Sequence, residues 1–234
     1  MINSKYFFKG ILCAKEFDSP AIALGLSFLA IGALLKNLGF TIQESIFSTF
    51  LTYALPGSLV MAESILIGVS LLNLFFAVWL VNARLYPMTV SLMPLLKNQS
   101  QSRWKYYLSC HFVAVSSWLI LKNNYKEIEK KYRVDFWIGI GTATWLIAIF
   151  STILGYYSAD FLNREMMIGL AIINPIYFTC TMIGVMKSIQ LNVSIILGAI
   201  LGPLFYLISP DWCVLIGGFI AGTVAFVIGE KNVS

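Results

Sequence analysis

The feature that most constrains this chain is a series of long segments without Asp, Glu, Lys or Arg. These segments cover residues 20–35, 45–62, 64–83, 85–96, 106–121, 136–159, 166–186, 188–210 and 212–229. A helix needs about 20 apolar residues to cross a bilayer, with about 17 as the lower limit. Most of the segments approach or exceed this length, whereas 85–96 is too short alone and 106–121 is marginal. The pattern therefore predicts an integral membrane protein that is surrounded by a lipid bilayer.

Composition narrows the fold class further. Hydrophobic residues make up 59% of the 234 residues and charged residues 12%, whereas soluble domains carry about 25% charged residues. The segments are longer than the roughly 10-residue alternating strands of a membrane barrel, so we predict helices. We expect an all-α integral membrane protein that forms one polytopic domain, residues 1–234. This helical bundle would have about 7–8 membrane segments, some of them broken by Pro or Gly.

The same composition excludes several function classes. The longest polar stretch, Lys122–Asp135, is too short for a soluble catalytic domain. No G-x-x-x-x-G-K-[ST] motif is present to bind ATP, and no G-x-S-x-G nucleophile elbow occurs. The single histidine, His111, is not part of a set of ligands at metal-binding spacing. We therefore expect no enzyme activity, no metal and no cofactor.

Basic residues gather in three clusters. They are Lys5/Lys9/Lys15, Lys97/Arg103/Lys105 and Lys122/Lys126/Lys130/Lys131/Arg133. In a helical membrane protein such clusters mark cytoplasmic loops, so the formal charge of +5 does not indicate nucleic acid. We expect all three clusters on the cytoplasmic side. Since segment 106–121 has a basic cluster on each side, either it does not fully cross or one loop departs from the rule.

The charge pattern divides the domain into four parts. They are a cytoplasmic amphipathic lead-in (1–19), a first half (20–98), a basic connecting region (99–135) and a second half (136–229). The lead-in is predicted to be a short helix on the membrane surface, because its apolar residues share one helical face. That face consists of Phe7, Phe8, Ile11 and Leu12.

A Pro-Gly pair interrupts the second apolar segment. Thr41 and Glu44 have capping-box spacing, which predicts the start of a helix. This helix then meets Pro56, Gly57 and Ser58 in mid-membrane, where Pro removes a hydrogen bond and clashes with the preceding turn. Unpaired backbone groups at that depth are tolerated only when they are buried in protein or line a cavity. The interruption is therefore a candidate substrate site.

A second interruption occurs at Asn174 and Pro175, inside segment 166–186. Pro56 and Pro175 lie 119 residues apart, and the same shift superposes the first two apolar segments on later ones. Transporters often contain two repeats, each with a Gly- or Pro-broken helix near the midplane. The match in hydropathy indicates a possible internal repeat.

Arg84 is the only charged residue between Ser64 and Leu96. An ionised side chain at membrane depth costs from about 3 to over 10 kcal/mol and usually faces protein or water. One interpretation places Arg84 at the membrane–water boundary, where it reaches the lipid headgroups. The other places Arg84 and the nearby Asn82 on the lining of a transport pathway.

The available polar groups suit a zwitterion with an apolar tail. Free amides at a half-helix N-terminus after Pro56 can bind a carboxylate, and Arg84 can add a bidentate grip. An ammonium group can be held by backbone carbonyls or by side-chain oxygens of Ser58, Asn82 or Asn174. An apolar pocket would come from Met61, Phe75, Trp79 and Met88. The predicted substrate-binding residues are Pro56, Gly57, Ser58, Asn82, Arg84, Asn174 and Pro175.

Glu63 and His111 are candidates for proton coupling. Glu63 ends an apolar segment, where it either faces water or acts as a protonatable group of a coupled exporter. Near the C-terminus, Gly198-x-x-x-Gly202 and Gly218-x-x-x-Gly222 have the spacing of closely packed membrane helices. We expect these glycines to pack internally, with a docking face for another membrane subunit as the alternative.

The order of these features resembles a known family. A first span precedes a helix interrupted at Tyr53-Ala54-Leu55-Pro56-Gly57-Ser58, and an apolar run follows that ends in Val81-Asn82-Ala83-Arg84-Leu85-Tyr86-Pro87. This order is similar to that of the AzlC family, the large permease subunits of bacterial branched-chain amino acid exporters. The resemblance centres on Ser27–Leu96, and looser similarity in hydropathy extends to Gly229.

The resemblance implies a multi-pass permease of the bacterial cytoplasmic (inner) membrane that exports valine, leucine or isoleucine. It also implies a small hydrophobic partner subunit of the AzlD type. Gly57, Asn82 and Arg84 carry over from the family by position. The glutamine that many members have at the break, and an acidic motif expected near His111–Val115, are replaced in this chain.

Two other functions are open at this point. A non-transporting membrane scaffold or assembly subunit would use the same helices without moving a substrate. A membrane enzyme is the weaker alternative, because acids, bases and nucleophiles are so few within the apolar segments.

Overall fold

The computed structural model describes residues 3–15, 20–83, 85–98, 103–163, 189–208 and 213–231, with residues 165–166, 168–170, 172, 176, 179 and 180. The chain forms two compact units, Met1–Tyr177 and Phe178–Ser234. The first contains α1 (Ser4–Lys15), α2 (Pro20–Asn37), α3 (Ile42–Thr52), α4 (Leu55–Ile67), α5 (Leu71–Asn82), α6 (Leu85–Leu96), α7 (Arg103–Ser109), η1 (Cys110–Phe112), α8 (Val115–Asn124), η2 (Tyr125–Glu127), η3 (Lys130–Tyr132) and α9 (Arg133–Ser158). The second contains α11 (Ile189–Ile208) and α12 (Cys213–Lys231). Every regular element in the described residues is helical, which confirms the predicted all-α class.

Three helical stretches are long and apolar enough to cross a membrane. They are α2, the stretch Lys130–Ser158 that contains α9, and Leu191–Ile208 in α11. α5 and α6 qualify together as a broken span, with a bend of 49° between them. The chain is thus a helical membrane protein. The number of about 7–8 membrane segments stays a prediction, since the described residues supply three spans, or four with the bent pair, by length and composition.

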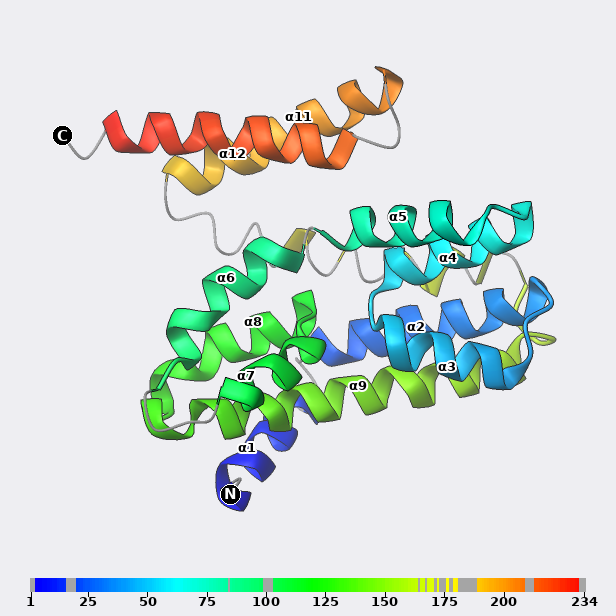
Figure 1. Cartoon of the computed structure of the whole chain (residues 1–234), viewed down its shortest axis with the longest axis horizontal. Helices are drawn as coiled ribbons and strands as arrows, with labels where there is room; N and C mark the ends of the chain where they lie inside the picture. The colour runs from blue at the N-terminus through cyan, green and yellow to red at the C-terminus, as the bar shows by residue number, and fades with distance from the viewer. Residues whose placement is uncertain are drawn as a thin grey trace. The chain divides into compact units, whose positions relative to one another are not determined.

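The contact between α2 and α9 forms the centre of the first unit, where the two helices run side by side in the same direction (Figure 1). Gly32 of α2 lies against the backbone of Thr152, and Gly155 of α9 lies against the backbone of Leu29. A Cβ atom at either glycine would overlap a carbonyl oxygen. Small residues at such positions let membrane helices approach closely. The pair also holds α3, because the buried hydroxyls of Thr49 and Thr152 lie 3.0 Å apart.

α1 packs against the first half of α9. Gly10 and Gly139 make the close contact, and Ala14 is buried beside them. The predicted lead-in therefore contains a helix, but the residues that pack differ from the predicted apolar face. Phe8 and Leu12 of that face are exposed, at 60% and 64% of their surface. The small residues are buried instead, because only they permit the two backbones to touch. The position of α1 on the cytoplasmic surface stays a prediction.

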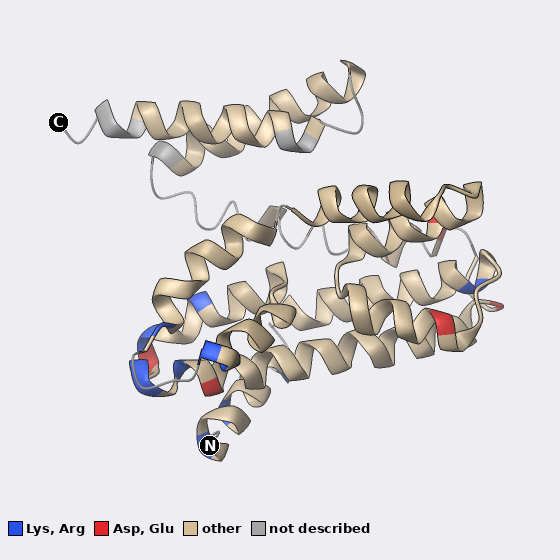
Figure 2. Ribbon diagram, viewed as in Figure 1, with Lys and Arg blue, Asp and Glu red and all other residues tan. Residues whose placement is uncertain are grey.

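The three basic clusters meet at one end of the first unit, near the start of α9 (Figure 2). Lys9 of the first cluster lies 3.9 Å from Glu127, beside the third cluster. Lys105 of the second cluster lies 3.6 Å from the buried carboxylate of Asp135. Segment 106–121 thus leaves this end and returns to it. Both alternatives for the crossing of this segment stay predictions, with its two ends on the same side of the first unit.

α3 and α4 form a hairpin that begins and ends at the opposite end of the unit (Figure 1). The predicted capping box starts α3: the Glu44 amide donates to Thr41 Oγ1 at 3.3 Å, and the Thr41 amide donates to Glu44 Oε2 at 2.7 Å. α4 then returns alongside α3, so that Phe47 and Ile65 line one common groove. α3 and α4 thus fold back on one another as a hairpin.

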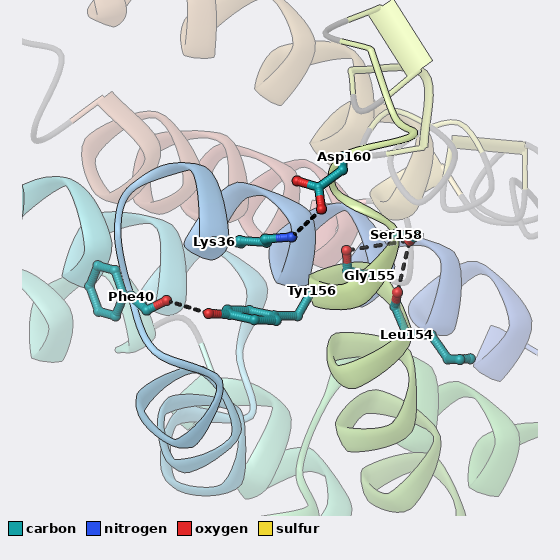
Figure 3. Close-up of polar contacts among 7 residues, drawn as sticks. All are labelled: Lys36, Phe40, Leu154, Gly155, Tyr156, Ser158 and Asp160. Carbon is teal, nitrogen blue, oxygen red and sulfur yellow. Dashed lines mark hydrogen bonds and ion pairs between the residues drawn. The ribbon is translucent and has the colours of Figure 1, made fainter.

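Polar contacts fix the end of α9 beside the start of this hairpin (Figure 3). Lys36 Nζ lies 2.6 Å from Asp160 Oδ2, and the Tyr156 hydroxyl donates to the Phe40 carbonyl at 3.0 Å. Because Lys36 ends α2 and Asp160 follows α9, both long helices finish at the same end of the unit. The α2–α3 turn is held between them.

α7, η1 and α8 form a second hairpin that starts from the basic end (Figure 1). α7 and η1 lead inward, the chain turns at Val113 and Ala114 in extended conformation, and α8 leads back. Trp137 Nε1 of α9 donates to the Ser109 carbonyl at 3.2 Å, which holds the inward arm. The two hairpins thus enter the unit from opposite ends.

In the second unit, α11 and α12 pack together, but not through the predicted glycine pairs. A Cβ atom on Gly198, Gly202, Gly218 or Gly222 would meet no atom within 4 Å. The contact is made at Gly217, where an added Cβ would lie 3.5 Å from the backbone nitrogen of Gly202 in α11. Gly217 is buried, as are Ala221 and Ala225 of the same helix. Gly202 therefore takes part in the internal packing through its backbone, whereas Gly198, Gly218 and Gly222 have open space where a Cβ would be added.

The α2–α9 contact can be tested with Gly32→Ala. The added Cβ would overlap the Thr152 carbonyl, and overpacking of this kind costs about 1–3 kcal/mol. We expect a lower midpoint of thermal unfolding for the purified protein in detergent. Gly198→Ala is the control, because its Cβ would meet open space. Equal midpoints for the two variants would contradict the close contact.

The two-hairpin topology can be tested with single cysteines in a variant that lacks the four native cysteines. We expect Lys5→Cys and Lys126→Cys to react with a membrane-impermeant maleimide from one side of the membrane, and Gln43→Cys from the other. All three positions are exposed. Labelling of Lys5→Cys and Lys126→Cys from opposite sides would show that α7 and α8 form a crossing.

Candidate functional site

The break between α3 and α4 lies at Tyr53 and Ala54, just before the predicted position. Tyr53 has φ 35° and ψ 34°, a left-handed conformation that costs about 1–2 kcal/mol in a residue with a Cβ. Pro56 does not interrupt a helix but stands in the first turn of α4. The reason is that the first turn requires no intrahelical donor, so proline fits there without loss. Tyr53 is 3% exposed, and strain of this kind is found mainly at functional sites.

Gly57 and Asn82 are brought into contact across α4 and α5. A Cβ atom at Gly57 would lie 2.6 Å from Asn82 Nδ2 and 2.8 Å from Asn82 Oδ1. It would also lie 3.0 Å from the methyl group of Thr52. Asn82 Oδ1 is buried and has no hydrogen-bond partner in the described part of the chain. Gly57 and Asn82, which both carry over from the family resemblance by position, thus lie in contact.

Ser58, also predicted, is fully buried one turn into α4. Its backbone amide donates to the Ala54 carbonyl at 2.9 Å, whereas its hydroxyl oxygen has no partner within the described residues. The helix start has no side-chain cap, because Ala54 occupies the N-cap position. A buried hydroxyl and uncapped amides therefore lie together at the start of α4.

A cavity of about 450 Å³ opens between α3 and α4. It is lined mainly by apolar side chains, and the polar groups in its lining come from Glu44, Ser48 and Thr52. Of the predicted pocket residues, Met61 lines this cavity. The other three do not: Phe75 and Trp79 are exposed on α5, and Met88 packs into the core around α9. Thr52 connects the cavity to Gly57, since its methyl group is the third neighbour of that glycine.

A second helix break, between η1 and α8, lies beside the first. The rings of Tyr53 and His111 have centroids 6.2 Å apart, and Ala114 belongs to the same buried cluster as Tyr53. The rings of Trp145 in α9 and His111 have centroids 6.0 Å apart. Trp145 Nε1 also donates a hydrogen bond to the Phe50 carbonyl at 3.3 Å. The aromatic rings thus join both breaks to α9.

His111 was the only residue of this second break that the sequence predicted to be functional. Ser116 and Ser117 follow Ala114 in the first turn of α8 and are buried. Ser117 Oγ donates to the Phe112 carbonyl at 2.6 Å and accepts from the Ala114 amide at 3.0 Å. Ser116 Oγ has no partner in the part of the chain that the structure describes. The marginal length of segment 106–121 was the one signal that pointed here.

Glu63 and His111, the predicted proton-coupling residues, are not neighbours. Glu63 is exposed in the later turns of α4, about 13 Å along the helix axis from the break that His111 adjoins. A role in coupling stays a prediction for both. Within the described residues, no group of three His, Cys, Asp or Glu side chains is arranged to hold a metal.

Three predicted site residues lie outside the described residues: Arg84, Asn174 and Pro175. The boundary and pathway interpretations of Arg84 therefore both stay predictions, and so does the repeat at an offset of 119 residues. α5 ends at Asn82 and α6 begins at Leu85.

Comparison with known proteins agrees with the sequence resemblance. A family model described as AzlC protein matches residues 20–162. The chain belongs to the AzlC family. The matched region runs from α2 to the end of α9 and includes both helix breaks. No curated protein and no solved structure matches the chain.

The contact between Gly57 and Asn82 can be tested by a double-mutant cycle. Gly57→Ala should lower the thermal unfolding midpoint, because the added Cβ overlaps the Asn82 amide. Asn82→Ala should remove most of that penalty in the double variant, with a coupling free energy of about 1 kcal/mol or more. Gly222→Ala, whose Cβ would meet open space, is the control. Additive effects of the two substitutions would contradict the contact.

Proposed function

We propose that this AzlC-family protein is the permease subunit of a secondary transporter that exports branched-chain or similar hydrophobic amino acids. The observation that carries the proposal is the uncapped, buried start of α4, where Ser58 and Asn82 have polar atoms without partners in the described residues. Burying such groups unpaired is unfavourable by about 1–3 kcal/mol each. A polar substrate head that enters the site supplies the partners.

The substrate's parts match the groups at this break. The free amides of the first turn of α4 attract a carboxylate. Asn82 Oδ1 is an acceptor suited to an ammonium group. The apolar side chain of the substrate is placed in the cavity between α3 and α4, whose volume of about 450 Å³ lies within the range of small-molecule sites.

Several expectations from the sequence extend this proposal. Arg84 either grips the carboxylate or braces the bend, and Asn174 with Pro175 forms the counterpart break of the second half. Glu63 or His111 takes up the coupling proton. A small hydrophobic subunit of the AzlD type completes the exporter in the bacterial inner membrane.

A non-transporting scaffold is the second candidate, and one observation favours it. A Cβ added at Gly198, Gly202, Gly218 or Gly222 would meet no atom of the described residues within 4 Å. Open glycine surfaces of this kind can receive another membrane helix. This candidate predicts partner binding without substrate flux.

Liposome counterflow of leucine, valine and isoleucine, with and without a co-expressed small subunit, separates the two candidates. We expect saturable exchange by the wild type and a loss of about tenfold or more in Asn82→Ala, because a lost hydrogen bond to a charged group is worth about 1.5–3 kcal/mol. Asn73→Ala, on an exposed part of α5, should transport like the wild type. Absence of flux in all preparations would support the scaffold.

Arg84→Ala separates the two roles of the arginine in the same assay. The pathway role predicts loss of exchange in a protein that still unfolds at the wild-type temperature. Exchange at the wild-type rate would place Arg84 at the membrane boundary instead.

A further inference from the structure

We propose that α8 supplies the second half of the substrate site, so that a carboxylate is held between the N-terminal turns of α4 and α8. The additional binding groups are the hydroxyls of Ser116 and Tyr53 and the first amides of α8. This inference rests on the proposed transport function and names the chemistry of the site: a small monocarboxylate with an apolar tail.

The α3–α4 hairpin and the α7–α8 hairpin turn in the same buried region. α4 and α8 are both returning arms, so each begins in the interior and leads outward to its own end of the unit (Figure 1). Tyr53, which precedes the N-cap of α4, and Ala114, the N-cap of α8, belong to one buried cluster, and the ring centroids of Tyr53 and His111 are 6.2 Å apart. Two helix N-termini from opposite directions thus end in one buried region.

Buried hydroxyl groups in this region lack hydrogen-bond partners within the described residues. Ser58 in α4 and Ser116 in α8 are 0% and 1% exposed, and neither hydroxyl has a partner in the described part of the chain. The hydroxyl of Tyr53 is also buried and makes no hydrogen bond of standard geometry within the described residues, but it interacts with the side chain of Thr144. Most buried polar side chains in proteins are hydrogen-bonded. Unpaired, buried hydroxyls in the first turns of both α4 and α8 therefore indicate a polar ligand.

The starts of α4 and α8 are electrostatically suited to an anion. Each helix start carries a partial positive charge from amides that have no intrahelical acceptor. Neither N-cap side chain accepts a hydrogen bond, because both are alanines. Segments 45–62 and 106–121, which form the two breaks, contain no acidic residue that would neutralise this charge. An anion bound there gains from both helices, whereas a cation is repelled, as at paired half-helices in channels.

Binding to the purified full-length chain in detergent tests the clamp. The probes are leucine, leucinamide, which lacks the carboxylate, and 4-methylpentanoate, which lacks the ammonium group. We expect leucine and 4-methylpentanoate to raise the unfolding temperature and leucinamide to leave it unchanged. Equal stabilisation by leucine and leucinamide would overturn the proposal.

The matched variants are Ser116→Ala and Tyr53→Phe, with Ser45→Ala as the control. Ser45 is as buried as Ser58, but its hydroxyl already donates to the Thr41 carbonyl at 2.9 Å. We expect Ser116→Ala and Tyr53→Phe to weaken binding of leucine and 4-methylpentanoate by about tenfold. The unfolding temperature of Ser116→Ala without ligand should stay equal or rise, because an unpaired polar group is removed. A purely structural role would lower it.

The outcomes distinguish this inference from the proposed function. Wild-type affinity in Ser116→Ala and Tyr53→Phe, together with weakened binding in Ser58→Ala, would reject the clamp and leave transport through the α4 site intact. Binding of 4-methylpentanoate that depends on Ser116, in a protein that exchanges no amino acid, would support the clamp and reject the proposed substrate. If the hydroxyls bind only water, neither leucine nor 4-methylpentanoate will raise the unfolding temperature. That result would reject the clamp.

Discussion

The close approach of α2 and α9 is the contact on which the first unit depends. Gly32 and Gly155 remove the Cβ atoms that would hold the two backbones apart. Lipid offers no hydrogen bonds, so an interrupted backbone at membrane depth has to be covered by protein. The α2–α9 pair provides this cover. Phe28 of α2 stacks over Tyr53 at 6.3 Å, and Trp145 of α9 binds the end of α3 at the Phe50 carbonyl.

This rigid support permits local features that would otherwise destabilise the fold. Tyr53 is held in a left-handed conformation, and the hydroxyls of Ser58 and Ser116 are buried without partners in the described residues. Proteins depart from ideal local structure mainly where function requires it, and compensate elsewhere. Here the compensation is the close glycine packing of α2 on α9 and the aromatic contacts around His111.

The candidate site was partly predictable from the residues. Gly57 and Ser58 were identified at a helix interruption and Asn82 as a polar residue near Arg84, and the structure joins Gly57 to Asn82 across two helices. Ser116 and Tyr53 were not identified, because a serine or tyrosine in an apolar segment has no distinctive spacing. Their significance depends on burial and, for Ser116, on the absence of a partner in the described chain, and both are properties of the folded molecule.

The sequence by itself determined the class of fold, the capping box that starts α3 and the common side of the basic clusters. Each follows from local properties: segment length, a three-residue spacing, and the distribution of Lys and Arg. Only the tertiary structure decided which apolar segments fold back as hairpins, that the first break falls at Tyr53 rather than Pro56, and that Gly217 rather than Gly218 packs on α11. Helices that are apolar on all sides carry no pattern that selects one face, so long-range contacts between backbones and side chains make that choice.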